Sequence, residues 1–263
     1  MGKQLAGKSA VVTGSTSGIG RAIASMYASE GANVMLNGFG DGAQIEALRA
    51  GLEKSHGVKV RFHGADMSKP AQVAELVKAA EAELGAVDIL VNNAGIQHVS
   101  PIDEFPDERW EAVIAINLSS AFYATKAALP GMKKRRWGRI VNIASAHGLV
   151  ASPNKSAYVA AKHGIVGFTK ATALEVAEAG VRANAICPGF VLTPLVQKQI
   201  DDLARQHNIT TERATKDYIL APQPTKEFVT VEQIASMALY LASEAAAQIN
   251  GASFSIDGGW TAR

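Results

Sequence analysis

The sequence predicts an α/β fold in which helices cover both faces of a seven-stranded parallel sheet. Short apolar runs alternate with helical patterns along all 263 residues, which is typical of parallel sheets. The first of these runs, Lys8 to Thr13, leads directly into a glycine-rich turn. No linker rich in Pro, Ser or Gly and no block of charge interrupts the chain. We therefore predict one domain over residues 1–263.

The glycine-rich turn reads GSTSGIG over residues 14–20, and a helical pattern follows it to about Glu30. A strand, a turn and a helix start in this order bring free backbone N–H groups and the positive helix end towards a pyrophosphate. The spacing is GxxxGxG rather than the commoner GxGxxG. We predict a doubly wound, Rossmann-like domain that binds a dinucleotide through Gly14, Ser15, Thr16, Ser17, Gly18, Ile19 and Gly20.

The end of the predicted second strand bears on the choice between NAD and NADP. An acidic residue there would bond the 2′-hydroxyl of the adenosine ribose and repel a 2′-phosphate. Asn37 stands there instead, and neither residues 15–17 nor residues 37–42 contain a basic residue to pair with a 2′-phosphate. Because that cation is missing, we predict NAD as the cofactor. We expect Phe39 to cover the adenosine, while Asp41 can equally be the cap of the next helix.

The remaining elements alternate regularly. Helices are predicted over residues 42–55, 70–84, 106–134, 156–178 and 231–242, and strands over residues 33–37, 58–62, 87–91, 140–143, 181–186 and 253–256. The strand at 87–91 is expected beside the first strand and runs into the sequence NNAG. This places Asn93, Ala94 and Gly95 at the carboxyl edge of the sheet, where open parallel sheets bind their ligands.

Composition narrows the classes of function. The net charge of +2 is too balanced to indicate a nucleic-acid or membrane partner, and a basic cluster at residues 133–139 is expected to be a solvated helix end before a turn at Gly138. Cys187 is the only cysteine, so no disulfide can form within the chain. The sequence shows no apolar run of roughly 18 residues and no metal-ligand spacing. Because the N-terminus leads directly into a predicted strand, we expect no signal sequence. We expect a cytoplasmic protein without a metal.

The stretch from Arg139 to Lys170 carries the most specific chemistry. Tyr158 and Lys162 stand four residues apart and so share one face of a helix, and Ser145 lies at the end of the preceding strand. A phenol, with a pKa of about 10, is a poor base at neutral pH unless its phenolate is stabilised. At an effective dielectric of about 20 and a separation of about 4 Å, the Lys162 ammonium would contribute roughly 4 kcal/mol, or about 3 pKa units. An exposed Tyr and Lys on an amphipathic helix is the alternative.

Ser145, Tyr158 and Lys162 at these spacings, with the GxxxGxG turn and the NNAG segment, resemble the short-chain dehydrogenase/reductase family over essentially the whole chain. The resemblance implies a nicotinamide-dependent oxidoreductase, usually a homotetramer, with Asn117 completing the catalytic set. In the family the matching Asn holds a water that links the lysine to solvent; a polar residue that only bends the helix is the alternative. The resemblance also implies cofactor contacts from Asp66, Met67, Tyr158, Lys162, Pro188, Gly189, Val191, Thr193 and Leu195, although an isolated Asp66 is also typical of a turn.

Four polar side chains are predicted to surround a small anion beside the phenol: Gln97, His147, Lys155 and Gln199. His147 points to the same side as Ser145 if the chain stays extended there, and Lys155 projects near the phenol if the helix begins early enough. Lys155 would supply the positive charge, and the amides of Gln97 and Gln199 would fix the orientation of the anion. Residues 193–225 look like a substrate lid. Each of the four also has an ordinary explanation as a loop, strand-end or solvated helix residue.

Within the family, the surroundings of Ser145 (SAHGLVAS), the NGFG segment and the C-terminal DGGWTAR resemble members that interconvert D-3-hydroxybutyrate and acetoacetate. This closer resemblance implies that the four polar side chains hold the substrate carboxylate. It also implies that Trp260, near a C-terminus that could reach across a subunit contact, forms an apolar wall for the substrate methyl group. Phe190 stands where a Trp is common in such relatives, which keeps the pocket aromatic but leaves its size open.

Two other functions stay open from the sequence. A 3-oxoacyl-thioester reductase of the same family would use NADPH and would need cations near residues 15–17 or 37–42. A non-catalytic dinucleotide sensor would share the fold without needing the catalytic set Asn117, Ser145, Tyr158 and Lys162. The intact set favours an enzyme, and the missing cations favour an NAD-dependent hydroxy acid dehydrogenase.

Overall fold

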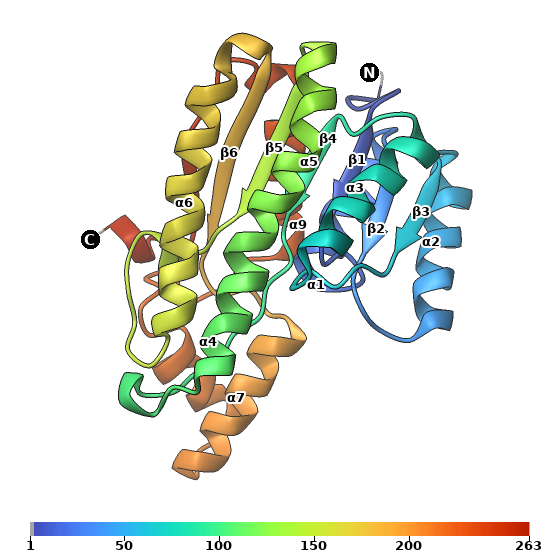
Figure 1. Ribbon diagram of the computed structural model, residues 1–263. Helices are drawn as coiled ribbons and strands as arrows, with labels where there is room; N and C mark the ends of the chain where they lie inside the picture. The colour runs from blue at the N-terminus through green and yellow to red at the C-terminus, as the bar shows by residue number, and fades with distance from the viewer. Residues whose placement is uncertain (1–2, 263) are drawn as a thin grey trace.

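The computed structural model describes residues 3–262, apart from the side chains of Pro194 and Leu195. Seven parallel strands form one sheet in the order β3-β2-β1-β4-β5-β6-β7 (Figure 1). Their bounds are β1 Ser9–Val12, β2 Asn33–Asn37, β3 Val60–His63, β4 Ile89–Asn92, β5 Gly138–Ile143, β6 Val181–Pro188 and β7 Ser253–Ile256. The predicted doubly wound α/β fold is therefore confirmed.

The strand order reverses between β1 and β4. β1 pairs with β2 on one side, where Val12 faces Leu36, and with β4 on the other, where Val12 faces Val91. The turn after β1 and the NNAG segment after β4 consequently leave the same edge of the sheet side by side, as predicted. A crevice opens at such a switch point because the two connections diverge to opposite faces.

Helices cover both faces of the sheet. In Figure 1, α3, α5 and α6 lie in front of the strands and α9 lies behind them, and α1 and α2 share the core on the side of α9. The α-helices of the sheet layers are α1 Gly18–Ser29, α2 Gly42–His56, α3 Pro70–Leu84, α4 Asp107–Ile114, α5 Ser120–Arg135, α6 Ser156–Val176 and α9 Val231–Ala242. Short 3₁₀ turns occupy Ile102–Glu104, Ala146–Gly148, Ala177–Ala179, Glu244–Ala246 and Trp260–Ala262.

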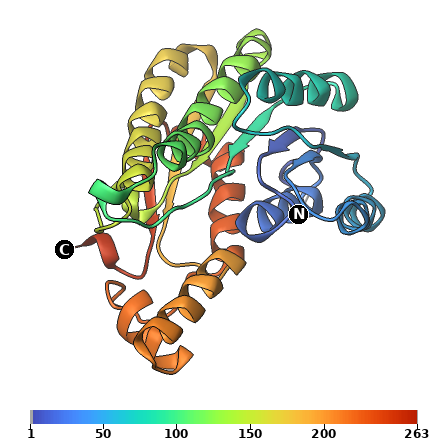
Figure 2. The same cartoon turned by 60° about the horizontal axis from the view of Figure 1, so that its bottom comes forward.

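The segment predicted as a lid is mostly helical and projects from the body of the fold at the carboxyl edge of the sheet (Figure 2). It consists of α7 (Pro194–His207), α8 (Thr211–Arg213) and a π turn at Ala214–Ile219. Although the segment is polar in sequence, it buries a small apolar cluster of its own around Ile200 and Leu220.

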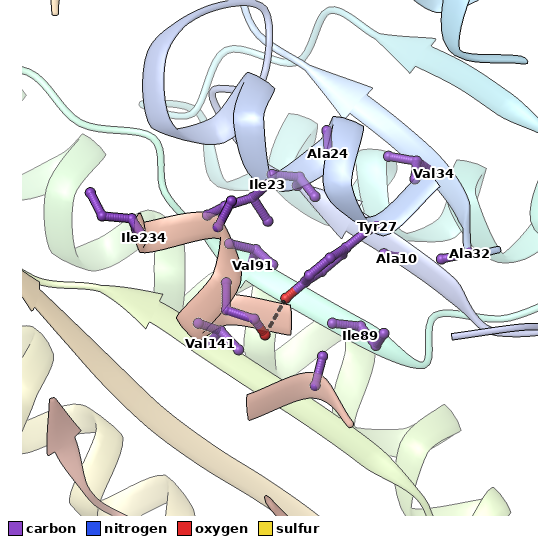
Figure 3. Packing of buried hydrophobic residues seen from close by; sticks show 14 of the residues in the cluster. Ala10, Ile23, Ala24, Tyr27, Ala32, Val34, Ile89, Val91, Val141 and Ile234 are labelled. Carbon is purple, nitrogen blue, oxygen red and sulfur yellow. Dashed lines mark hydrogen bonds between the residues drawn. The ribbon is translucent and has the colours of Figure 1, made fainter. Parts of the chain in front are cut away.

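Tyr27 on α1 is the largest of the fully buried side chains in the core between α1, α9 and the sheet. Its ring packs among Ala10, Ile23 and Val91, and its hydroxyl donates a hydrogen bond of 2.9 Å to the Ala238 carbonyl on α9 (Figure 3). The bond satisfies a buried polar group that would otherwise cost stability. Tyr27 therefore joins the first and last long helices of the domain.

Two details depart from the sequence-based boundaries. The predicted turn at Gly138 lies instead at Arg136, whose φ is 54°, and Gly138 begins β5. A Cβ at Gly138 would lie 2.7 Å from the Met132 sulfur, so only glycine lets the strand pass this close to α5. The predicted long helix at 106–134 is interrupted by a π turn at Ala115–Ser119.

Although no apolar run long enough for a membrane span was expected, the helical segment Asp107–Arg135 is long and apolar enough, by length and composition alone, to cross a membrane. One side of it is part of the domain core, because Val113, Ala121, Ala124 and Met132 are buried. Its last turn carries three basic residues. Burial of one face against the sheet accounts for its apolar character.

We predict that Tyr27→Phe lowers the free energy of unfolding by about 1 kcal/mol, because one buried hydrogen bond is lost while the ring keeps its packing. Urea denaturation measures this value. The matched control is Tyr240→Phe, which removes a hydroxyl from a half-exposed ring on α9. Equal effects of the two substitutions would contradict the role assigned to the Tyr27 hydroxyl.

Candidate active site

In the glycine turn after β1, Gly14 and Gly20 have no room for side chains. A Cβ at Gly20 would lie 2.3 Å from the Gly14 carbonyl oxygen, and Gly14 and Gly18 have φ values of 63° and 54°. The Ser17 side chain makes no capping hydrogen bond at the start of α1. The N–H groups of the first helical turn are thus free to bind an anion, which fits a pyrophosphate.

A cavity of about 380 Å³ opens over this turn. Most of the cofactor-binding residues predicted from the sequence line it, namely Gly14, Thr16, Ser17, Gly18, Ile19, Phe39, Asp66, Met67, Asn93, Ala94, Gly95 and Thr193. Ser15 and Gly20 do not line the cavity. The Ser15 hydroxyl is hydrogen-bonded to the backbone of Asn37 on β2, and Gly20 packs against Gly14. The walls also include residues that were not predicted from the sequence, among them Ala65, Ile96 and Ile116.

Asn37 does not offer a free amide to the ribose. Its side chain accepts a hydrogen bond from the Gly14 N–H at 3.3 Å and donates to the carbonyls of His63 and Ala65 at 3.0 Å. This buried amide ties β2 to the glycine turn and to the end of β3. Its position at the strand end is therefore explained by the fold.

Two charged residues, Arg21 and Asp41, lie close to the expected ribose site. Arg21, one turn into α1, lines a hollow next to the cavity together with Thr16, Phe39 and Asp41. Asp41 also caps α2 by accepting a hydrogen bond of 2.9 Å from the Gln44 N–H, as predicted. Arg21 lies outside residues 15–17 and 37–42, where a cation for a 2′-phosphate was expected, so the prediction of NAD did not include it.

A second cavity, of about 160 Å³, continues from the first. The two share the lining residues Ile19, Asn93, Gly95, Ile96 and Thr193. The second cavity brings together all six residues predicted for the substrate and three of the four predicted for catalysis: Gln97, Ser145, His147, Lys155, Tyr158, Lys162, Phe190, Gln199 and Trp260. Pro188, Gly189 and Val191 also line it, whereas the side chain of Leu195 lies outside the described part of the chain.

Lys162 is buried beneath this cavity, and its ammonium donates a hydrogen bond of 2.8 Å to the Ile143 carbonyl at the end of β5. Burial lowers the pKa of Lys162 to about 8. The ammonium lies 5.6 Å from the centre of the Tyr158 ring, on the same face of α6 as predicted. Burial raises the pKa of Tyr158, and the hydrogen bond with Ser145 opposes that rise. Without a cofactor, the chain therefore does not make this phenol acidic.

Ser145 and His147 both line the cavity, but the extended chain assumed between them is wrong. Residues 146–148 form a 3₁₀ turn in which the Ser145 hydroxyl accepts a hydrogen bond of 3.1 Å from the His147 N–H. The His147 Nε2 lies 2.8 Å from the Ser152 hydroxyl. Burial, and next the Lys155 charge, lower the pKa of His147 to about 4. His147 is therefore neutral at physiological pH and can present one N–H donor.

The far end of the cavity combines charge with aromatic rings. The Lys155 ammonium lies 5.5 Å from the centre of the Phe190 ring, and burial lowers its pKa. Phe190 stacks on Trp260 with ring centres 5.1 Å apart and planes inclined by 7°, so Trp260 reaches this wall within its own chain. The buried Gln97 Nε2 has no hydrogen-bond partner. An unsatisfied donor beside an ammonium suits a bound anion.

Asn117 lies outside the cavity lining, in the π turn between α4 and α5. Its side chain accepts a hydrogen bond from the Ile96 N–H and donates one to the Ile96 carbonyl, both at 2.9 Å. The Asn117 amide is therefore paired with the segment that follows NNAG.

Comparisons with known proteins show the family to which the chain belongs. Residues 8–204 match the short chain dehydrogenase family. The chain is 58% identical to the D-beta-hydroxybutyrate dehydrogenase of Cupriavidus necator (strain H16), covering 98% of this chain and all of that one. It is 57% identical to the D-beta-hydroxybutyrate dehydrogenase of Rhizobium meliloti (strain 1021), with coverage of 97% and 99%. The crystal structure of levodione reductase is similar at a TM-score of 0.89 and 33% identity, over 98% of this chain and 99% of that one. The chain therefore belongs to the short-chain dehydrogenase family, which implies a nicotinamide dinucleotide cofactor.

Proposed function

We propose that this enzyme is an NAD-dependent D-3-hydroxybutyrate dehydrogenase that interconverts D-3-hydroxybutyrate and acetoacetate in the cytoplasm. The main support is the small cavity in which Tyr158 faces a group of hydrogen-bond donors and the Lys155 ammonium. Such a cavity suits an anion whose hydroxyl lies a short distance from its carboxylate. The names of the two relatives above agree with this substrate.

The substrate carboxylate would bind at the donor-rich end of the cavity. Lys155 would supply the charge, while Gln97, His147 and Gln199 would donate hydrogen bonds that fix its orientation. The methyl group would lie against the stacked rings of Phe190 and Trp260. Binding at both ends holds the carbinol carbon in one position, which lowers the entropic part of the barrier.

Tyr158 would act as the general base. The Ser145 hydroxyl would bond the substrate oxygen, and the Tyr158 phenolate would take its proton as the carbonyl forms. Lys162 would stabilise the phenolate and bind the ribose of the cofactor. When bound, NAD⁺ supplies the hydride acceptor. Asn117 would then help return the proton to solvent through a water; since its amide is occupied by Ile96, its backbone carbonyl is the group we assign to that water.

The remaining expectations follow from the same family relationship. The segment 193–225 would act as the substrate lid, and the cofactor would contact the residues that line the larger cavity. A homotetramer is supported by the apolar side chains that α5 and α6 expose, such as Phe122 and Leu174. Size-exclusion chromatography with light scattering measures the assembly.

The cofactor and the substrate can be tested together. Fluorescence titration should show tighter binding of NADH than of NADPH, and NAD⁺ should support oxidation of D-3-hydroxybutyrate in preference to the L enantiomer. Because Arg21 lies beside the expected ribose site, tighter NADPH binding with reduction of 3-oxoacyl thioesters is the competing result. That result, or no oxidation of either enantiomer, would overturn the proposal.

We predict that Tyr158→Phe lowers kcat by at least about 100-fold, since the general base is lost, while the dissociation constant for NADH changes little. Single-turnover kinetics and NADH fluorescence measure the two quantities. Tyr218→Phe, on a half-exposed lid residue, is the matched control. Full activity of the Tyr158 variant would exclude this assignment.

Lys155→Ala should raise KM for D-3-hydroxybutyrate by about 10- to 100-fold, because a charge-assisted contact is worth about 1.5–3 kcal/mol. KM for a neutral secondary alcohol should change much less. Steady-state kinetics on both substrates give the comparison, with Lys198→Ala on the exposed side of α7 as the control. An equal rise for both substrates would show that Lys155 does not bind the carboxylate.

A further inference from the structure

Gln223 is fully buried, although it lies in a lid segment that is polar in sequence. It stands just after the π turn at Ala214–Ile219, in the segment that connects this turn to α9. We call this segment, residues 220–230, the lid stem. It does not line either of the two cavities described above. A buried side-chain amide is costly unless its oxygen and nitrogen both find partners.

Both ends of this amide are bonded. Its oxygen accepts a hydrogen bond of 3.1 Å from the Phe190 N–H, and its nitrogen donates to the Glu227 carbonyl. The Phe190 carbonyl in turn accepts a hydrogen bond of 2.9 Å from the Val229 N–H. The two backbone groups of Phe190 are therefore both held by the lid stem.

Two glycines leave space for Gln223. A Cβ at Gly189 would lie 2.5 Å from the Gln223 amide oxygen, and a Cβ at Gly258 would lie 2.8 Å from the Gln223 Cγ. Gly189 follows the end of β6, and Gly258 follows the end of β7. The ends of both strands thus meet at this side chain.

The same region positions Trp260. The Asp257 carboxylate accepts hydrogen bonds of 3.0 Å from the N–H groups of Gly259 and Thr261, which closes the turn that carries Trp260. Trp260 then stacks on Phe190. The relative position of the two rings depends on Asp257 on one side and on Gln223 on the other.

We propose that Gln223 is a positioning residue: its amide fixes Phe190 against Trp260 and thereby sets the width of the cavity end that receives the substrate methyl group. The assignment of that end to a hydroxy acid rests on the proposed function. A neutral amide is suited to the position because it must accept from Phe190 and donate to Glu227 at the same time.

Gln223→Glu tests this requirement through pH. The protonated carboxyl can accept from the Phe190 N–H and donate to the Glu227 carbonyl, so it reproduces both bonds. The ionised carboxylate cannot donate, and its second oxygen faces the carbonyl. Burial raises the pKa of the introduced carboxyl above its usual value of about 4.3, which brings the change into an accessible range.

We therefore compare KM for D-3-hydroxybutyrate between Gln223→Glu and the wild type at each pH. The ratio of the two KM values should be near one at low pH and should rise about tenfold as the introduced carboxyl ionises. The dissociation constant for NADH should stay within about twofold. Gln223→Leu, which lacks both bonds at every pH, should show the raised KM without a pH step. Gln206→Glu, the same change on an exposed residue of α7, should leave KM unchanged.

Unchanged KM in both Gln223 variants would overturn the proposal. So would a parallel loss of NADH binding and kcat, because that pattern indicates general damage to the fold. If the wild type does not oxidise D-3-hydroxybutyrate, the proposed function fails but Gln223 can still be tested by tryptophan fluorescence. Gln223→Glu should then show a pH-dependent change that disappears when Trp260→Phe is added, and the absence of such a change would contradict the role of Gln223.

Discussion

The hydrogen bond between the buried Lys162 ammonium and the Ile143 carbonyl is the contact on which the site depends. A buried cation needs a partner, and here the partner is the last residue of β5. The bond fixes α6 against the carboxyl end of that strand. Tyr158, one helical turn earlier, and Ser145, two residues beyond Ile143, are consequently brought together by α6 and the end of β5.

The other half of the site depends on the reversal of strand order between β1 and β4. Glycines bring the backbone after β1 close to Asn93 and Ala94, and this leaves a cavity open over the start of α1. That cavity continues into the smaller cavity that Tyr158 lines. A dinucleotide bound over α1 can therefore extend towards the phenol. Phe190, just after β6, and Trp260, in the C-terminal turn, then stack at the far end.

Local patterns predicted the fold well where one periodic signal dominates. The bounds of β2, α3, α9 and β7 agree with the predicted ones. The six residues predicted to bind the substrate line one cavity. Tertiary contacts decide the remainder. The Asn37 side chain bonds three backbone groups, one in the glycine turn and two at the end of β3. Arg21 lies on a helix beside the expected ribose site. Nothing near Gln223 in the sequence indicates that it is buried. The 3₁₀ turn after Ser145 likewise replaced the extended chain that was assumed.

The central claim is that Lys162 and the bound cofactor together make Tyr158 acidic, although burial alone raises its pKa. The most direct measurement is an ultraviolet difference titration of tyrosine ionisation, comparing the wild type with Tyr158→Phe, each with and without saturating NAD⁺. The account predicts that the complex gains one tyrosine that ionises about 3 pKa units below the usual value of about 10, and that this signal is missing from the variant. A Tyr158 pKa that stays at or above about 10 in the complex would contradict it.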